Sequence, residues 1–224
     1  MPIIAEPKPK RVNLVESLYD LLKKDIIECR LQPGEMLQET FVRERYQIGH
    51  TPFREACQRL EAEGLIQIIP RRGYFVPSFS NKDIRDLFEL RSAVEALAVE
   101  LACERGNPGG FQALESNLEE FRILIETRPP SLPQEINWNN KAFHTLVGRL
   151  SDNLELESAV ERIHNKLMRI IMFTTRITPE EQFSNSLHPR IFEALREKKV
   201  SEARKWMVKD INVARDWIRD AVRI

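Results

Sequence analysis

Four side chains in the second half of the chain have the types and spacing of a metal-ion site. Asn140 and His144 are four residues apart, which places them on one face of a helix. His188 and Asp210 each lie eleven residues from Lys199, so an antiparallel helix pair that turns there would bring them level. Two imidazoles, one carboxylate and a neutral amide oxygen suit a divalent transition ion such as zinc, nickel or manganese. The spacing is therefore permissive for a shared metal ion or another ligand, and several sets of side chains would satisfy it.

A further histidine has a similar placement. His164 and His144 lie level if their helices are joined by a turn in the sequence SDNL. The neighbours of His164 on its own helix are Val160, Leu167 and Ile171, which are all apolar. We therefore interpret His164 as a partly buried polar residue and leave it out of the metal set.

Arginines at regular spacing form a second candidate ligand group. Arg162, Arg169 and Arg176 recur every seven residues and thus share one face of a helix. Such a stripe is commonly solvated, but arginines that face a cavity would suit a carboxylate ligand. We take Arg162 and Arg169 as candidate effector-binding residues. Arg91 and Glu95 are one helical turn apart and have the spacing of a simple ion pair of small value.

The first half of the chain has the pattern of short helices followed by two strands. Apolar residues recur at helical spacing until Pro33 and Gly34 break the first helix. Thr51 has the type of an N-cap residue and Pro52 suits the first helical position, which predicts a third helix that ends before Gly64. The predicted elements are helices over residues 14–29, Glu39–Tyr46 and Pro52–Glu63, and hairpin strands over Leu65–Ile69 and Tyr74–Val76.

This order of elements is typical of a winged helix-turn-helix, whose third helix enters the DNA major groove. One apolar stripe of that helix faces the core, which leaves Arg54 and Arg59 to face outward or to flank the stripe. Their guanidinium groups can bind guanine edges or phosphates, or can pair with acidic neighbours on the same helix. Arg71 and Arg72 at the hairpin tip form either an ordinary solvated turn or contacts with phosphates and the minor groove.

Three motifs over residues 12–79 resemble those of the GntR superfamily of bacterial transcription regulators: LQPGEMLQE, TPFREACQRLEAEGLI and PRRGYFV. The turn before the third helix usually reads Gly-Val-Ser-Arg-Thr-Pro in that family, and this chain has His50 in place of the arginine. The resemblance therefore implies a DNA-binding domain with a different operator sequence. The residues predicted to contact DNA are Thr40, Arg45, His50, Thr51, Arg54, Arg59, Arg71, Arg72 and Gly73.

The second half resembles the FCD-type effector domain of the FadR subfamily, through DIRDLFELRSAVEALAVELACER, NNKAFHTLVGRLSDN and LHPRIFEALREKKVSEARKWMVKDI. This resemblance implies a bundle of six or so helices and a small-molecule cavity, with Arg91 and Glu95 facing the cavity or the domain interface. Arg91 is therefore a third candidate effector-binding residue. Metal-carrying relatives supply an Asp and three His. The matching positions here are Asn140, His144, His188 and Asp210, so that the total ligand charge is unchanged. From this resemblance we predict a divalent metal, zinc, nickel or manganese, at these four residues, with open positions for an anionic oxygen of a small acid.

The predicted fold is mainly α: an N-terminal winged helix-turn-helix of three helices plus a β-hairpin wing, joined to an all-helical FCD-type bundle. The sequence VPSFSNKD separates two regions of different composition, which is typical of a linker. The predicted domains are a flexible tail over residues 1–11, the DNA-binding domain over 12–79, a linker over 80–84 and the helical ligand-binding and dimerisation domain over 85–224.

Composition limits the class of protein. Hydrophobic residues make up 42% and charged residues 30% of the 224-residue chain, as in soluble globular proteins. Lys plus Arg equals Asp plus Glu, at 34 each, so any attraction to nucleic acid has to be local. The three cysteines form no CxxC pair, and no signal peptide or membrane-span pattern occurs, which predicts a cytoplasmic protein.

The two family resemblances imply a DNA-binding transcription regulator, with no catalytic residues, that acts as a homodimer on a palindromic double-stranded operator. We expect it to be controlled by a small metabolite, an organic acid, that binds the helical domain through the metal. Two alternatives are a metal-dependent enzyme built on His144, His188 and Asp210, and a helical protein-interaction module. No nearby residue has the placement of a general base or nucleophile, which disfavours the enzyme.

Overall fold

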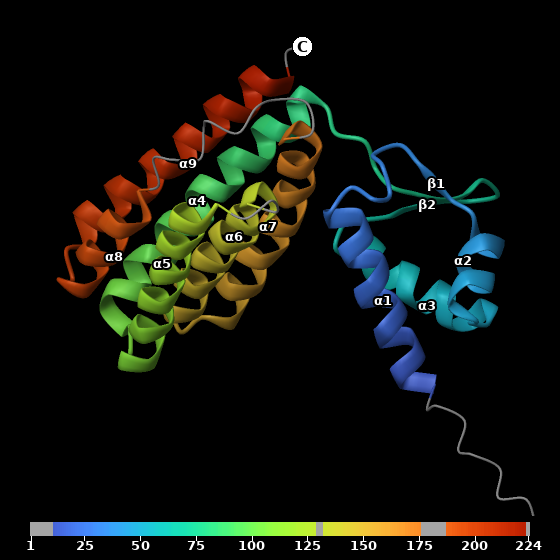
Figure 1. Ribbon diagram of the computed structural model, residues 1–224, viewed down its shortest axis with the longest axis horizontal. Coiled ribbons are helices and arrows are strands. Elements are labelled where there is room, and N and C mark those ends of the chain that lie inside the picture. Colours follow the sequence, from blue (N-terminus) through green and yellow to red (C-terminus); the bar gives the residue numbers. More distant parts are fainter. Residues whose placement is uncertain (1–10, 129–131, 176–186, 223–224) are drawn as a thin grey trace, which may run out of the picture. The chain divides into compact units, whose positions relative to one another are not determined.

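The computed structural model describes residues 11–128, 132–175 and 187–222, and the chain divides into two compact units between Ser78 and Phe79 (Figure 1). The described part of the first unit holds three helices and a three-stranded sheet, and that of the second holds six helices. This architecture confirms the predicted fold class, including the number of helices in the bundle. No described helix is both long and apolar enough to cross a membrane.

The N-terminal unit has the predicted helices and wing together with one additional strand. Its elements are α1 (Arg11–Ile27), β1 (Met36–Leu37), α2 (Glu39–Tyr46), α3 (His50–Ala62), β2 (Gln67–Ile69) and β3 (Gly73–Phe75). All strand pairs are antiparallel, in the order β1-β3-β2. The core is formed where the apolar faces of α1 and α3 meet, and it includes the buried side chains of Leu22, Phe53 and Leu60.

The sheet differs from the predicted hairpin at its ends. Leu65 and Ile66, predicted to begin a strand, are buried in the core, and the Leu65 N–H donates to the Leu60 carbonyl at the end of α3. Strand β1 was not predicted from the sequence, because two residues are too few to show alternation. Met36 and Leu37 nonetheless pair in register with β3.

The recognition helix α3 begins two residues earlier than predicted. Its N-cap is Gly49, so the prediction that Thr51 is the N-cap is wrong. The preceding helix ends at Gln47 in the left-handed conformation, with φ 51° and ψ 43°, which reverses the chain within a single residue. Pro52 still lies in the first turn of α3, where its missing N–H needs no partner.

The C-terminal unit is a helical bundle (Figure 1). Its helices are α4 (Asn81–Arg105), α5 (Pro108–Thr127), α6 (Leu132–Leu150), α7 (Leu154–Thr175), α8 (His188–Arg196) and α9 (Val200–Val222). Helix α4 packs against α6, α7, α8 and α9, and thus lies at the centre of the bundle. Val99, Leu114, Phe143 and Met207 are among the fully buried residues of its core.

The predicted linker over residues 80–84 is wrong, because these residues begin α4. Ser80 is the N-cap, and its hydroxyl and backbone N–H exchange hydrogen bonds with Asp83 in a capping box. Ile84 is already buried in the bundle core. A serine followed by Asn and Asp resembles a loop in composition, yet it is also the pattern that starts a helix.

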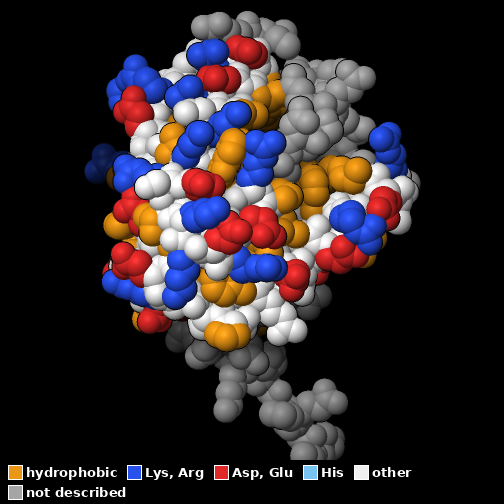
Figure 2. Space-filling model, turned by 90° about the vertical axis from the view of Figure 1, so that its left-hand side faces the viewer, with side chains coloured by type: hydrophobic (Ala, Val, Ile, Leu, Met, Phe, Trp, Pro, Cys, Tyr) orange, Lys and Arg blue, Asp and Glu red, His pale blue; other side chains and the backbone are white. Residues whose placement is uncertain are grey.

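Close packing of α6 against α7 depends on one glycine. A Cβ atom added at Gly148 would lie 3.3 Å from the Cβ of Val160 and 3.4 Å from the Cα of Glu157. The small residue therefore lets the two helices approach, one turn from His144. Outside this interior, basic and acidic side chains are interspersed over the face in Figure 2, in keeping with a net charge of zero.

Candidate functional site

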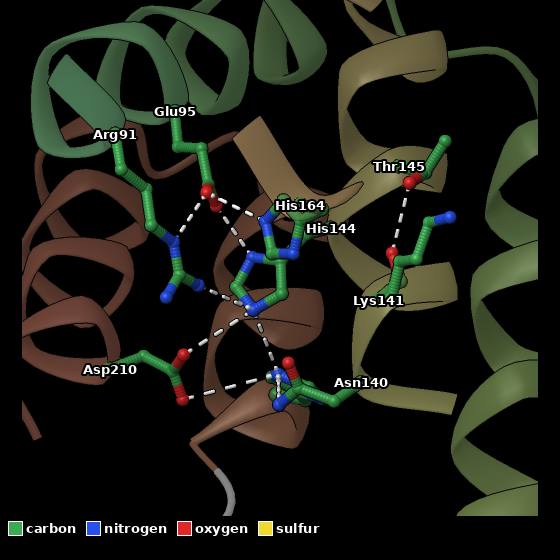
Figure 3. Close-up of polar contacts among 9 residues, drawn as sticks. Arg91, Glu95, Asn140, Lys141, His144, Thr145, His164 and Asp210 are labelled. Atoms are coloured by element: carbon green, nitrogen blue, oxygen red, sulfur yellow. Dashed lines mark hydrogen bonds and ion pairs between the residues drawn. The ribbon is translucent and has the colours of Figure 1, made fainter. Parts of the chain in front are cut away.

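Polar side chains from five helices meet in the centre of the bundle (Figure 3). The same helices supply an apolar core around them, so these groups can only be satisfied by one another or by a ligand. All except Asn140 and Asp210 are fully buried. The cluster consists of Arg91 and Glu95 on α4, Asn140 and His144 on α6, His164 on α7, His188 on α8 and Asp210 on α9.

The structure brings together all four residues of the predicted metal set. His144 Nε2 lies 3.3 Å from His188 Nε2 and 3.4 Å from Asp210 Oδ2. His188 Nε2 is 4.0 Å from Asp210 Oδ1, as expected from the turn between α8 and α9 near Lys199. The amide nitrogen of Asn140 lies 3.5 Å from His188 Nε2. A half-turn of that amide would present its oxygen instead.

These donor atoms fit a single transition-metal ion. Protein nitrogen and oxygen ligands lie about 2.0–2.2 Å from zinc, so two ligands of one ion are no more than about 4.3 Å apart. The three distances among His144, His188 and Asp210 all meet this limit. Burial lowers the pKa of His188 to about 3, so that its imidazole is neutral near pH 7 and has a lone pair for a metal.

Glu95 is the centre of a second group on the other side of His144. Its Oε1 accepts from Arg91 Nε at 2.6 Å and lies 2.8 Å from His164 Nε2, while its Oε2 lies 2.5 Å from His144 Nδ1. Burial alone would raise the pKa of Glu95, but the positive Arg91 and the two imidazoles hold it well below its usual range. The two contacts of Oε1 have the geometry of hydrogen bonds, whereas Oε2 and His144 Nδ1 are in close ion-pair contact without hydrogen-bond geometry.

The electrostatics of the shared His144 reflect both groups. Burial lowers its pKa, but the Glu95 carboxylate and the hydrogen bond with Asp210 outweigh this effect, and the net pKa is raised. Asp210 has a lowered pKa: burial would raise it, but the hydrogen bond with His144 and the electrostatic attraction of the neighbouring histidines and Arg91 prevail. A metal at this point would therefore have to displace any proton on His144 Nε2.

The predicted effector arginines have different environments. Arg91 is buried, and its second terminal nitrogen lies 3.1 Å from His144 Nε2, beside the metal set. Arg169 is also buried, and its guanidinium group lies over the Phe79 ring. Arg162 is exposed and donates to Ser158 Oγ, so the structure does not bring it to the cluster. Arg176 lies outside the described residues.

His164 has a larger role than the sequence indicated. It is fully buried, not partly, and its ring stacks on His144 with centroids 4.6 Å apart. Its bond to Glu95 was not predicted. The sequence indicated only that His144 and His164 lie level about the turn SDNL, which agrees with the stacking of their rings.

Most of the predicted DNA-contacting residues are exposed in the N-terminal unit. Two backbone conformations shape the wing: Arg71 has φ 63°, and Gly73 has φ 111°, which a side chain rarely adopts. The exposed residues are Thr40, Arg45, His50, Thr51, Arg54, Arg59, Arg71 and Arg72, and Gly73 is half-buried. Their contacts with DNA remain predictions.

Two of these residues are paired within the protein. Arg59 Nη1 lies 2.6 Å from Glu16 Oε2 on α1, and its guanidinium carbon is 4.0 Å from the Tyr19 ring centroid. Arg59 is therefore turned toward α1. Its partner lies on α1 and is not an acidic neighbour on α3, which was the alternative considered from the sequence. His50 Nε2 lies 3.4 Å from Glu39 Oε1 at the start of α2.

Comparison with protein families agrees with both units. Residues 14–76 match the family of bacterial regulatory proteins named gntR, and residues 86–212 match the FCD domain. The chain belongs to the GntR family. It is a DNA-binding transcriptional regulator with an FCD effector-binding domain, and this family assignment excludes the enzyme considered as an alternative.

Individual relatives support the same assignment, and a solved structure shares the fold. The chain is 30% identical to the uncharacterised HTH-type transcriptional regulator YdhC of Bacillus subtilis, over 87% of this chain and 86% of that protein. It is also 30% identical to the HTH-type transcriptional repressor RspR of Escherichia coli, over 82% of this chain and 79% of that protein. The structure of E. coli McbR/YncC shares the fold, with a TM-score of 0.77, 20% identity, and coverage of 94% and 97% of the two chains.

Proposed function

We propose that this regulator binds a palindromic operator as a homodimer, and that a small organic acid bound through a divalent transition metal controls its affinity for the operator. The observation that supports the metal is the close approach of donor atoms from His144, His188 and Asp210, which are 3.3 to 4.0 Å apart in the bundle. Buried ionisable groups with strongly perturbed pKa values that cluster in this way are candidates for a functional site.

Asn140, His144, His188 and Asp210 would hold the metal. With one carboxylate and three neutral groups, the ligand charge of minus one leaves a divalent ion positive, and such an ion supplies open positions that an anionic oxygen can fill. Arg91 provides a second anchor for a carboxylate, because its guanidinium group reaches within 3.1 Å of His144 Nε2. The chemistry of the site thus favours small carboxylic acids over neutral metabolites.

The DNA-binding unit would read the operator through α3 and the wing. Arg54 is exposed on α3, beside the buried stripe that includes Phe53 and Cys57. A guanidinium group at this place suits a guanine edge in the major groove. Arg71 and Arg72 extend the positive charge to the tip between β2 and β3, where phosphates and the minor groove are the expected partners.

Regulation would follow from a coupling free energy between the two sites. If the effector favours a dimer geometry that no longer matches the half-site spacing, operator affinity falls, and DNA must weaken effector binding by the same factor. Repression relieved by ligand is our proposal for the sign. The names of two E. coli relatives, the repressors RspR and GlaR, support it; GlaR is 41% identical over 58% of this chain and 59% of that protein.

The test uses the full chain, zinc, and malonate, succinate and citrate as carboxylate probes. Operator DNA is selected from a random-sequence library, and its affinity is measured with and without each acid. We expect at least one acid to weaken operator binding by the wild type, and its effect to vanish in the double variant His144→Ala, His188→Ala. Arg91→Met should weaken acid binding, whereas the exposed Arg162→Ala serves as the matched control. An acid response that survives in the double variant would contradict the proposal.

A further inference from the structure

Glu95 connects three helices of the bundle through its two carboxylate oxygens (Figure 3). Its Oε1 is shared by Arg91 Nε on the same helix and His164 Nε2 on α7, at 2.6 and 2.8 Å. Its Oε2 lies 2.5 Å from His144 Nδ1 on α6. The side chain is 1% exposed, so water does not compete for these partners.

The position of Glu95 decides which nitrogen of His144 faces the other ligands. A carboxylate paired with arginine is ionised and only accepts hydrogen bonds, so the proton of a neutral His144 has to lie on Nδ1. The lone pair then lies on Nε2, the atom 3.3 Å from His188 and 3.4 Å from Asp210. The opposite tautomer would place two acceptors against each other at Nδ1 and a proton in the metal site.

We propose that Glu95 is a positioning residue for the metal: it fixes the tautomer and the ring orientation of His144, and His164 in turn holds the Glu95 carboxylate. This inference rests on the proposed metal site. A carboxylate or carbonyl partner on the second nitrogen of a metal-bound histidine is the usual arrangement, and loss of such a partner commonly weakens metal binding by about 10–100-fold.

A purely structural role for Glu95 would be to neutralise Arg91. The geometry favours more than that, because the two oxygens have different partners: Arg91 uses Oε1, and His144 uses Oε2. If Glu95 served only as the counter-ion of Arg91, a contact with His164 on α7 would not be needed. If Glu95 only neutralises Arg91, its replacement should lower stability alone. If it also positions His144, its replacement should lower both stability and metal affinity.

The experiment measures zinc affinity of the full chain by competition with a chromogenic chelator, and thermal unfolding in the presence of EDTA. Glu95→Gln should weaken zinc binding by about 10–100-fold. Because this variant leaves a buried arginine unpaired and can fail to fold, the double variant Arg91→Met, Glu95→Leu removes the ion pair as a neutral unit. It should lose zinc affinity to a similar extent. Glu119→Gln breaks a surface pair with Arg122 and serves as the control.

A second readout reports the tautomer directly. Nitrogen-15 NMR of the zinc-loaded wild type should show the proton of His144 on Nδ1 and zinc on Nε2. Zinc on Nδ1, or equal zinc affinity in the wild type and in a folded Glu95 variant, would overturn the inference while leaving the metal site intact. A wild type that takes up no zinc would overturn both, and the measurements on the wild type alone distinguish these two results.

Discussion

Removal of one member of the buried pair Arg91 and Glu95 should strongly destabilise the helical unit. Both side chains are 1% exposed, and the Arg91 Nε to Glu95 Oε1 distance is 2.6 Å. Removal of one member of such a pair leaves a buried charge without its partner, which typically costs about 3–5 kcal/mol. Replacement of both members by apolar residues of similar volume is often close to neutral.

The structure predicts which single variant loses more free energy of unfolding. Arg91→Met leaves Glu95 with two imidazoles, His144 and His164, as partial compensation, so we expect a loss of about 3 kcal/mol. Glu95→Leu leaves the guanidinium group of Arg91 with no carboxylate within 4 Å among the described residues, and we expect about 5 kcal/mol. The double variant should recover most of either loss, which gives a coupling energy of several kcal/mol.

The assay is chemical denaturation of the four proteins with EDTA present, so that any metal does not contribute. The expected sequence of midpoints is wild type, then the double variant, then Arg91→Met, then Glu95→Leu. Single variants that each lose less than about 1 kcal/mol would show that the pair behaves as an exposed ion pair does, and the reasoning from burial would be refuted.

Further predictions concern the DNA-binding unit and the helix packing. Arg54→Ala should weaken binding to the selected operator by about 1–3 kcal/mol and should affect random DNA less, as measured by fluorescence anisotropy. Arg59→Ala should leave the salt dependence of DNA binding unchanged, because the side chain is paired with α1; a slope reduced by about one would show a phosphate contact. Gly148→Ala places a Cβ 3.3 Å from Val160; the overpacking cost of about 1–3 kcal/mol is offset by a helix-propensity gain of about 1 kcal/mol, so we expect a net loss of up to about 2 kcal/mol in thermal unfolding, and a gain in stability would contradict this packing. Burial raises the pKa of Cys57 to about 12, so a thiol reagent at pH 8 should label it only after unfolding; rapid labelling of the native protein would count against its burial.

The parts of the fold that could be predicted from the sequence are those set by periodicity and strong motifs. The α2 boundaries at Glu39 and Tyr46 were predicted correctly, because left-handed Gln47 ends the helix where the apolar pattern stops. The start of α4 was missed, because Ser80 and Asp83 have the composition of a loop and only their mutual hydrogen bonds show a capping box. Strand β1 depends on pairing with β3, which is a tertiary contact.

The candidate site was predictable as far as helix registers determine it. Residues that lie equally far along the chain from a turn between two antiparallel helices were predicted to meet. This predicted His188 beside Asp210 and His144 beside His164, and both contacts exist in the structure. Which residues share hydrogen bonds could not be predicted in this way. Glu95 meets His164 only because α4 packs against α7, a contact between segments 69 residues apart. The same limit explains Arg59, whose partner Glu16 comes from α1 and not from its own helix.

The central claim is that four side chains of the helical unit hold a metal that anchors the effector. Elemental mass spectrometry of untagged protein, purified gently and without chelators, tests it most directly. The account predicts close to one equivalent of a single divalent transition metal per chain, lost in the variant His144→Ala, His188→Ala. Protein without metal after incubation with zinc, nickel and manganese would contradict the account and would mean that Asn140 and Asp210 do not complete a metal site.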